Sequence, residues 1–452
     1  MKIDRRDFMR RVAGTSGAAL LGTVAGGGIS HAFGKQPPVS TKLSSYPSNP
    51  AIQHIVVVTM ENRSFDHFLG WVAGGQLRDY PKPGGGTEST YRLAPDYQGC
   101  GHPNPDHSYG GGRIENDGGA ADGWLLDPAN DDFSIGYFEE NDLPFLSSLA
   151  RNYLTLDRYF CSFLGPTYPN RIFMLAGQTD RIDNTVSKVS LPTIFDLLWR
   201  RRVSMRYYYN NLPFVALWGL RYLPISRTYD QFLDDAASGR LPHVSFVDPR
   251  FTILDTDLAN DDEPHTNVLR GDLFLAQTFN AVAQTPAWQN TVFIITFDEW
   301  GGFADHIPPP RVVAPNNVDQ DKDSNGDVLL GFRVPAIVAS PWTLNPDPST
   351  PVVNSTVLDH TSILKLIEGR WRLGHLTARD DPSNTDVGNL ADVLTGPWNP
   401  AVPNLNMPSN VPPSPCWLQN FAAPSTAQPA QTSSPWAPLA NSPLVKGWRL
   451  KQ

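Results

Sequence analysis

The stretch HIVVVTMENRSFDHFLG, residues 54–70, decides the fold class of this chain. It begins with β-branched, apolar residues at 55–58, which are typical of a strand buried on both faces of a parallel sheet. Polar residues follow directly, and the pattern then becomes helical. In an α/β fold, ligands bind just beyond the carboxyl ends of such strands. Glu61 and Asn62 occupy that position, although Asn62 or Ser64 acting only as a helix cap would also explain them.

A second stretch, VFIITFDEWGGFADHIPPP at 292–310, repeats this design. An apolar strand is followed by Asp298 and Glu299, then by two glycines, and then by Asp305 and His306. Because the carboxyl ends of parallel strands meet at one edge of a sheet, the two stretches predict a single site between them. Acidic oxygens on both strand ends favour a hard or borderline divalent cation as its ligand.

The rest of the chain alternates between strand and helix patterns, which predicts an α/β fold with a largely parallel central sheet. A long irregular stretch at about 71–135, rich in Gly, Asp and Asn, is expected to be functional because loops of this length usually are. We expect helices over 143–159, 172–176, 193–201, 268–282 and 361–369, and strands over 204–209, 244–247 and 332–340.

Length, charge and cysteine content limit the classes of function. The 452 residues suffice for one large domain or two ordinary ones, and 42 Pro and 36 Gly predict long ordered loops. A formal charge of −9 argues against non-specific binding to nucleic acid. Cys100, Cys161 and Cys416 allow one disulfide without indicating which pair forms it, and their spacing matches no zinc site.

The N-terminus has the pattern of a twin-arginine signal peptide. Arg5 and Arg6 precede a weakly apolar run at 12–29 that is studded with Ala and Gly, and small residues at 30–32 offer a cleavage site. An ordinary amphipathic helix explains this segment less well, because its glycines disfavour a stable helix. We therefore expect export by the twin-arginine machinery, with the mature protein periplasmic or secreted.

These observations divide the chain into four parts. The segment after the signal peptide is polar and reads as a linker, and the C-terminal part is rich in Pro, Ser and Asn with little periodicity. Such a composition predicts a segment that packs on the surface or is partly disordered. The expected parts are the signal peptide at 1–32, the linker at 33–50, the catalytic domain at 51–376 and the C-terminal extension at 377–452.

Loops between the predicted elements carry further candidate groups. Thr167 lies in a tight turn, PTYPNR, and a hydroxyl becomes a nucleophile when a metal or a base lowers its pKa. The guanidinium of Arg171 offers a bidentate fork for a phosphate. Histidines at 107, 265, 306 and 360 lie in or beside loops. Each residue alone is more simply a turn or loop residue, but together with two acidic strand ends they favour a phosphate-ester site.

Four blocks of sequence resemble the signature blocks of the bacterial and plant non-specific phospholipase C and acid phosphatase family. They are ENRSFDHFLG at 61–70, PTYPNR at 166–171, DEWGGFADHIPPP at 298–310 and GFRVPAIVASP at 331–341. The blocks keep their order over about 280 residues. That family is similar in fold to alkaline phosphatase, so the resemblance implies a three-layer α/β/α sandwich around a mostly parallel sheet.

The resemblance also implies roles for individual residues. Thr167 matches the position of the family's nucleophilic hydroxyl, which would form a phospho-enzyme intermediate. His107 and His265 lie in loops similar to the family's phosphate-contacting or proton-donating segments, and His306 lies inside a matching block. The implied cofactor is a divalent metal ion, which would be calcium, zinc, magnesium, manganese or iron. Its implied ligands are Glu61, Asn62, Asp298 and Glu299.

Three functions are compatible with this pattern. The first is a metal-dependent phospholipase C that acts on phospholipids through transient contact with a membrane surface. The second is a broad-specificity acid phosphatase that acts on small phosphate esters. The third is an exported protein that binds a phosphorylated ligand without turnover. Thr167 resembles the phospholipase branch, whereas the acid phosphatase branch tends to have Ser there, so we expect a phospholipase C.

Overall fold

The computed structural model describes part of the chain. The predicted signal peptide at 1–32 and the linker up to residue 48 lie outside the described residues. Within the described part, no helix is long and apolar enough to cross a membrane. The described residues are 49–253, 258–409, 411, 416, 434–448 and 450.

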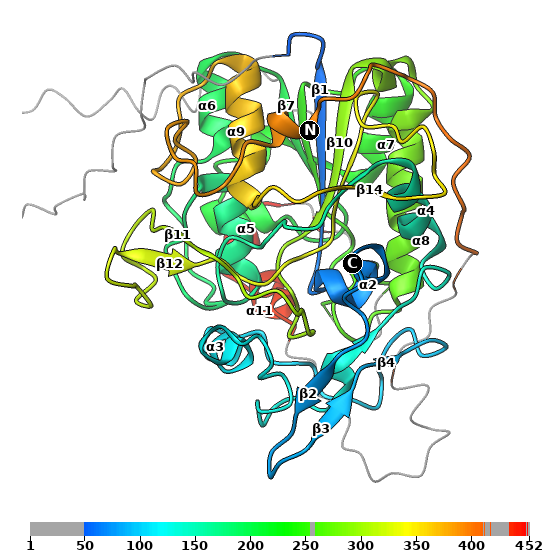
Figure 1. Ribbon diagram of the computed structural model, residues 1–452. Helices are drawn as coiled ribbons and strands as arrows, with labels where there is room; N and C mark the ends of the chain where they lie inside the picture. The colour runs from blue at the N-terminus through cyan, green and yellow to red at the C-terminus, as the bar shows by residue number, and fades with distance from the viewer. Residues whose placement is uncertain are drawn as a thin grey trace, which may run out of the picture. The chain divides into compact units, whose positions relative to one another are not determined.

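An eight-stranded sheet forms the centre of the structure, with strand order β14-β6-β13-β10-β1-β9-β7-β8 (Figure 1). Strand β13 runs antiparallel to both of its neighbours, and all other neighbours in this sheet are parallel. The strands span β1 (His54–Met60), β6 (Leu154–Leu156), β7 (Met205–Tyr209), β8 (Ser226–Thr228), β9 (Val244–Val247), β10 (Thr291–Phe297), β13 (Ala336–Ala339) and β14 (Val352–Asn354).

The two acidic strand ends lie next to each other, as predicted. Strand β1 is buried between β9 and β10, which explains its continuous apolar run. The register of β1 and β10 pairs Met60 with Phe297. Glu61 and Asp298 therefore follow their strands at the same edge of the sheet.

Helices cover both faces of the sheet, which confirms the three-layer α/β/α prediction (Figure 1). One layer contains α5 (Thr167–Ala176), α6 (Ile194–Arg200) and α9 (His360–Trp371), and the other contains α4 (Pro144–Asn152), α7 (Tyr229–Ala237) and α8 (Val268–Ala283). Thr193 caps α6 with a capping box, and Asp359 caps α9 in the same way. Both helices therefore begin where capping chemistry predicts them.

Some predicted elements are wrong in their bounds. The helix expected over 143–159 ends at Asn152, because Leu154–Leu156 pairs with β13 and β14 instead. Buried strand pairing outweighs helix propensity there. The strand expected over 332–340 is limited to β13.

The stretch at 71–135, expected to be irregular, contains short elements. Helix α2 (Phe65–Ala73) runs into it, and β2 (Asp79–Pro81) pairs with β3 (Thr87–Ser89). Other short strands and α-helices of the structure are β4 (Tyr91–Arg92), α3 (Gly111–Asn116), β5 (Gly136–Tyr137), β11 (Arg311–Val313), β12 (Asp327–Leu329) and α11 (Trp436–Ala440).

Cys100 and Cys416 form a disulfide, and Cys161 is buried as a free thiol. The cross-link joins the loop before His102 to the C-terminal extension across 316 residues of sequence. Cross-linking such distant positions restricts the unfolded chain, which stabilises the folded state.

We expect Cys416→Ser to lower the free energy of unfolding by about 2–4 kcal/mol. The measurement is urea unfolding with and without a reductant. Reductant should lower the midpoint of the wild type and leave that of the variant unchanged. A wild-type midpoint that does not respond to the reductant would show that the cross-link contributes nothing.

Candidate active site at the carboxyl ends of β1 and β10

The backbone at the ends of β1 and β10 is tightly folded. Asn62 adopts a left-handed conformation with φ 56°, and its backbone N–H donates to Asp298 Oδ1 at 3.2 Å. Gly301 has φ 66°, and a Cβ on it would lie 2.0 Å from the Asn62 carbonyl oxygen. Only glycine allows this approach, so the glycine turn of the second stretch serves to bring the strand ends together. The left-handed backbone of Asn62 is strained for a non-glycine residue, and strain of this kind is typical of functional sites.

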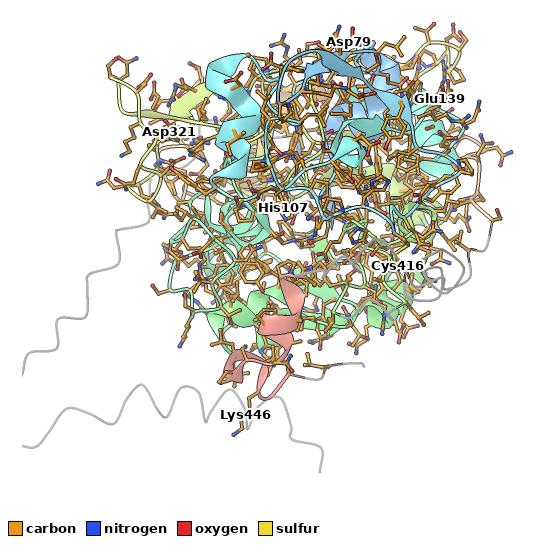
Figure 2. The ribbon with its side chains drawn as sticks, turned by 90° about the horizontal axis from the view of Figure 1, so that it is seen from below. Asp79, His107, Glu139, Asp321, Cys416 and Lys446 are labelled. Carbon is orange, nitrogen blue, oxygen red and sulfur yellow. A yellow bond between two sulfur atoms is a disulfide. The ribbon has the colours of Figure 1, made fainter. Side chains whose placement is uncertain are left out.

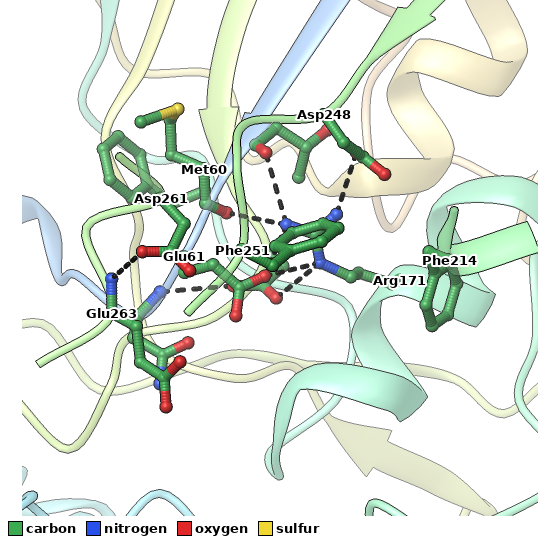
Figure 3. A network of polar contacts seen from close by, with 12 residues as sticks. Met60, Glu61, Arg171, Phe214, Asp248, Phe251, Asp261 and Glu263 are labelled. Atoms are coloured by element: carbon green, nitrogen blue, oxygen red, sulfur yellow. Dashed lines mark hydrogen bonds and ion pairs between the residues drawn. The ribbon is translucent and has the colours of Figure 1, made fainter. Parts of the chain in front are cut away.

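Arg171 lies at the centre of a buried ionic network (Figure 3). Its Nε donates to Glu61 Oε1 at 2.8 Å and to Asp298 Oδ2 at 2.9 Å. Nη1 donates to Asp248 Oδ1 at 3.0 Å, and Nη2 donates to two carbonyl groups at the end of β1. The structure thus gives this guanidinium a different role from the predicted phosphate contact, because it binds three carboxylates of the protein itself.

Three carboxyl groups share the single positive charge of Arg171. Burial raises the pKa of Glu61 and of Glu299 well above ordinary values, and the charge of Asp298 adds to this effect. Burial also raises the pKa of Asp248 to about 7, although Arg171 opposes the shift. A bound cation would favour the charged forms of these groups.

Asn62 Oδ1, Thr167 Oγ1 and Glu299 Oε1 are among the oxygen atoms in this region that are buried without a hydrogen-bond partner. Buried polar atoms are nearly always paired, so these three are suited to a ligand. Amide, hydroxyl and carboxylate oxygens are donors for a divalent cation.

The carboxylates of Glu61, Asp298 and Glu299, all of them described, do not come within 4.8 Å of one another as a cluster. Arg171 instead joins Glu61 and Asp298. Asn62 Oδ1 and Glu299 Oε1 have no hydrogen-bond partner, and the carboxylates of Glu61 and Asp298 keep lone-pair sites beside the hydrogen bonds that they accept. The structure brings the four predicted metal ligands to one edge of the sheet but shows no converged set of carboxylates.

The turn before α5 presents Thr167 at a helix N-terminus. Asn170 Nδ2 donates to the carbonyl groups of Phe163 and Gly165 at 3.0 and 2.8 Å, and Asn170 Oδ1 accepts from the Phe163 N–H at 2.9 Å. These bonds close the turn, so α5 begins at Thr167 rather than at 172 as predicted. The helix dipole at the N-terminus of α5 favours negative charge beside this hydroxyl.

His107 lies beside the strand ends, as predicted, and near the centre of the end view in Figure 2. Its Nδ1 donates to the Pro105 carbonyl at 2.8 Å, since a carbonyl only accepts. In the neutral ring, Nε2 then lacks a proton and accepts from Asn62 Nδ2 at 3.3 Å, and it lies 3.8 Å from Glu299 Oε1. Burial lowers the pKa of His107, which favours the neutral ring. A neutral imidazole in this position can accept a proton.

His265 and His306 have other partners. The Nε2 of His265 donates to the His102 carbonyl at 3.0 Å, which ties two loops together. His306 Nδ1 donates to Asp66 Oδ2 at 2.5 Å, and Arg333 binds the other oxygen of that carboxylate at 2.8 Å. Both histidines hold neighbouring loops in place, and their roles toward phosphate remain predictions.

Three further residues contact this network. Asp248 follows the buried strand β9 directly, so it lies at a strand end in the same way as Glu61. His360 Nε2 donates to the Asp298 carbonyl at 2.8 Å. Trp436, in the C-terminal extension, donates to Glu61 Oε2 at 3.0 Å, and no sequence pattern indicates this contact.

The sequence model of the Phosphoesterase family matches residues 52–374. The chain belongs to the phosphoesterase family. The matched range contains the ends of β1 and β10 and the start of α5. Membership makes this protein a hydrolase of phosphoric ester bonds.

Curated relatives cover most of the chain. It is 31% identical over 370 residues to non-specific phospholipase C6 of Arabidopsis thaliana, and the alignment covers 73% of this chain and 70% of that protein. It is 30% identical over 481 aligned positions to phospholipase C B of Mycobacterium tuberculosis, and this alignment covers 89% of this chain and 88% of that protein. These similarities support phospholipase C activity in the broad sense.

Solved structures are more distant. A protein of the alkaline phosphatase superfamily from Vibrio parahaemolyticus is 12% identical, covers 75% of this chain and 72% of its own, and has a TM-score of 0.34. The lipoteichoic acid synthase LtaP from Listeria monocytogenes is 8% identical, covers 76% and 80%, and has a TM-score of 0.39. Scores this low transfer no site geometry.

Proposed function

We propose that this phosphoesterase is an exported, metal-dependent phospholipase C. It hydrolyses a phospholipid such as phosphatidylcholine to diacylglycerol and a phosphorylated head group, at a membrane surface that it contacts transiently. The observation that carries the proposal is the buried, unpartnered hydroxyl of Thr167 at the N-terminus of α5. The similarity to phospholipases C over most of the chain supports the choice of a phosphodiester substrate.

The proposed reaction has two steps. Thr167 Oγ1 attacks phosphorus, the bond between phosphorus and the diacylglycerol oxygen breaks, and diacylglycerol leaves with a proton. The head-group phosphate then remains esterified to Thr167, and water hydrolyses this ester to regenerate the hydroxyl. The neutral ring of His107 is the candidate for proton transfer, because its Nε2 is an acceptor.

A divalent metal ion fits the unpaired oxygens and the excess of buried carboxylates. When bound, it would lower the pKa of the nucleophile and neutralise charge on the phosphate. Oxygen donors suit calcium, magnesium or manganese, and a set that includes His107 would suit zinc or iron. The residues that would hold it are Glu61, Asn62, Asp298 and Glu299.

Export rests on the twin-arginine pattern of residues 1–32, which lies outside the described residues. The disulfide between Cys100 and Cys416 supports it, because disulfides persist mainly in oxidising compartments outside the cytosol.

A paired assay on the purified mature protein tests the proposed function. We expect release of phosphocholine from phosphatidylcholine to exceed release of phosphate from a chromogenic monoester, and chelation to abolish both until one divalent ion restores them. Preference for the monoester at acid pH would instead indicate an acid phosphatase. Full activity after exhaustive chelation and dialysis would contradict the metal.

A further inference from the structure

The described end of the C-terminal extension, residues 434–448, returns to the active site. Helix α11 lies at the carboxyl end of β1 (Figure 1). Two hydrogen bonds anchor the segment just before it: Ser434 Oγ donates to the Thr252 carbonyl, and the Tyr168 hydroxyl donates to the Pro435 carbonyl. Tyr168 directly follows the proposed nucleophile. The segment expected to pack on the surface therefore contacts the proposed machinery.

Trp436 is completely buried at this contact. Its ring stacks on Phe251, with centroids 3.7 Å apart and planes at 17°. Its Nε1–H donates to Glu61 Oε2 at 3.0 Å, while Arg171 binds the other oxygen, Oε1. The two oxygens of Glu61 thus have separate donors, which fixes the orientation of the carboxylate.

Packing alone does not account for this hydrogen bond. An indole N–H is a donor only, and Trp288 and Trp448 are buried in the same structure with no partner for theirs. Burial of an indole in this protein therefore does not require a carboxylate acceptor. The indole N–H of Trp436, in contrast, donates to Glu61, which is one of the four proposed metal ligands.

We infer that Trp436 is a positioning residue, which holds the Glu61 carboxylate for the divalent cation and makes the C-terminal extension part of the active site. The inference rests on the proposed function, because it assigns Glu61 to the metal. Groups that hydrogen-bond a metal ligand fix its orientation, and replacing them typically costs about 10-fold to 100-fold in metal affinity or activity.

Trp436→Phe tests this inference, because it keeps an aromatic ring against Phe251 and removes the indole N–H donor. The matched control is Trp448→Phe, in the same segment, whose ring contacts Tyr209 instead. The readouts are calorimetric titration of metal-stripped protein with Ca²⁺, Mn²⁺ and Zn²⁺, and kcat and KM for a chromogenic ester. We expect Trp436→Phe to bind the ion about 10-fold more weakly and to lose kcat with KM nearly unchanged. Trp448→Phe should match the wild type in both.

Equal ion affinity and equal kcat in Trp436→Phe and wild type would overturn the inference. If the wild type itself binds no divalent ion, the metal of the proposed function is wrong, and kcat alone then decides the role of Trp436. If Trp436→Phe does not fold, Ser434→Ala replaces it, because Ser434 Oγ accepts the backbone N–H of Trp436 at 3.2 Å. That variant should weaken ion binding several-fold, and unchanged binding would equally overturn the inference.

Discussion

Thr167→Ala should lose on the order of 10⁴-fold in kcat, while the protein stays folded. The variant lacks the oxygen that would carry the head-group phosphate, and the other hydroxyl at the start of α5, that of Tyr168, donates to the Pro435 carbonyl. Thr167→Ser retains a hydroxyl and should keep a substantial part of the activity. The measurement is turnover of phosphatidylcholine and of a chromogenic ester by purified variants with matched far-UV circular dichroism.

The control for this prediction is Thr155→Val. Thr155 Oγ1 is also buried without a partner, but it lies in β6 between β13 and β14. Removal of the Thr155 hydroxyl should leave kcat close to that of the wild type.

In the metal-free protein, Thr167→Val should raise the free energy of unfolding by about 1 kcal/mol, because an unpaired buried hydroxyl is costly. Equal turnover by Thr167→Ala and the wild type would rule out the proposed nucleophile.

Arg171→Met should lower the free energy of unfolding by about 3–5 kcal/mol. The substitution leaves the carboxylates of Glu61, Asp248 and Asp298 buried without their shared cation. The measurement is urea unfolding of metal-free protein at neutral pH. The matched control is Arg221→Met, whose exposed pair with Asp196 should contribute no more than about 1 kcal/mol.

The loss in Arg171→Met should depend on pH in a defined direction. Burial already raises the pKa of Asp248 to about 7 in the presence of Arg171. A carboxyl group whose pKa is raised on folding favours the folded state in its protonated form, and this contribution disappears as pH rises through the folded pKa. Removing the guanidinium raises the pKa of Asp248 further, because Arg171 opposes the rise. The loss in the free energy of unfolding should therefore be largest above pH 7 and smallest at acid pH. An equal loss at acid and neutral pH would contradict this.

The fold was largely predictable because its strands are buried on both faces. The apolar runs of β1 and β10 have no solvent-facing positions, so a buried parallel pair is the simplest structure for them. The predicted bounds of helices and strands are wrong where strand pairing competes with local helix preference. At Leu154–Leu156, a helical sequence pattern forms a strand between β13 and β14 instead.

The site was predictable only in part, for a different physical reason. Residues at strand ends, such as Glu61 and Asp298, follow from the topology, and Asp248 would have followed from the same argument. The role of Arg171 does not follow, because sequence cannot show whether a guanidinium meets a ligand or the carboxylates of its own chain. Trp436 lies in a segment without periodicity, so only the three-dimensional contact with Glu61 reveals it.

In the proposed mechanism, Thr167 carries the head-group phosphate during turnover. The most direct test is to quench the reaction with phosphatidylcholine rapidly in acid and to map the modified peptide by mass spectrometry. We expect one phosphocholine group on Thr167, and none on the same peptide of Thr167→Ala. An adduct on another residue, or the same adduct in Thr167→Ala, would contradict the account.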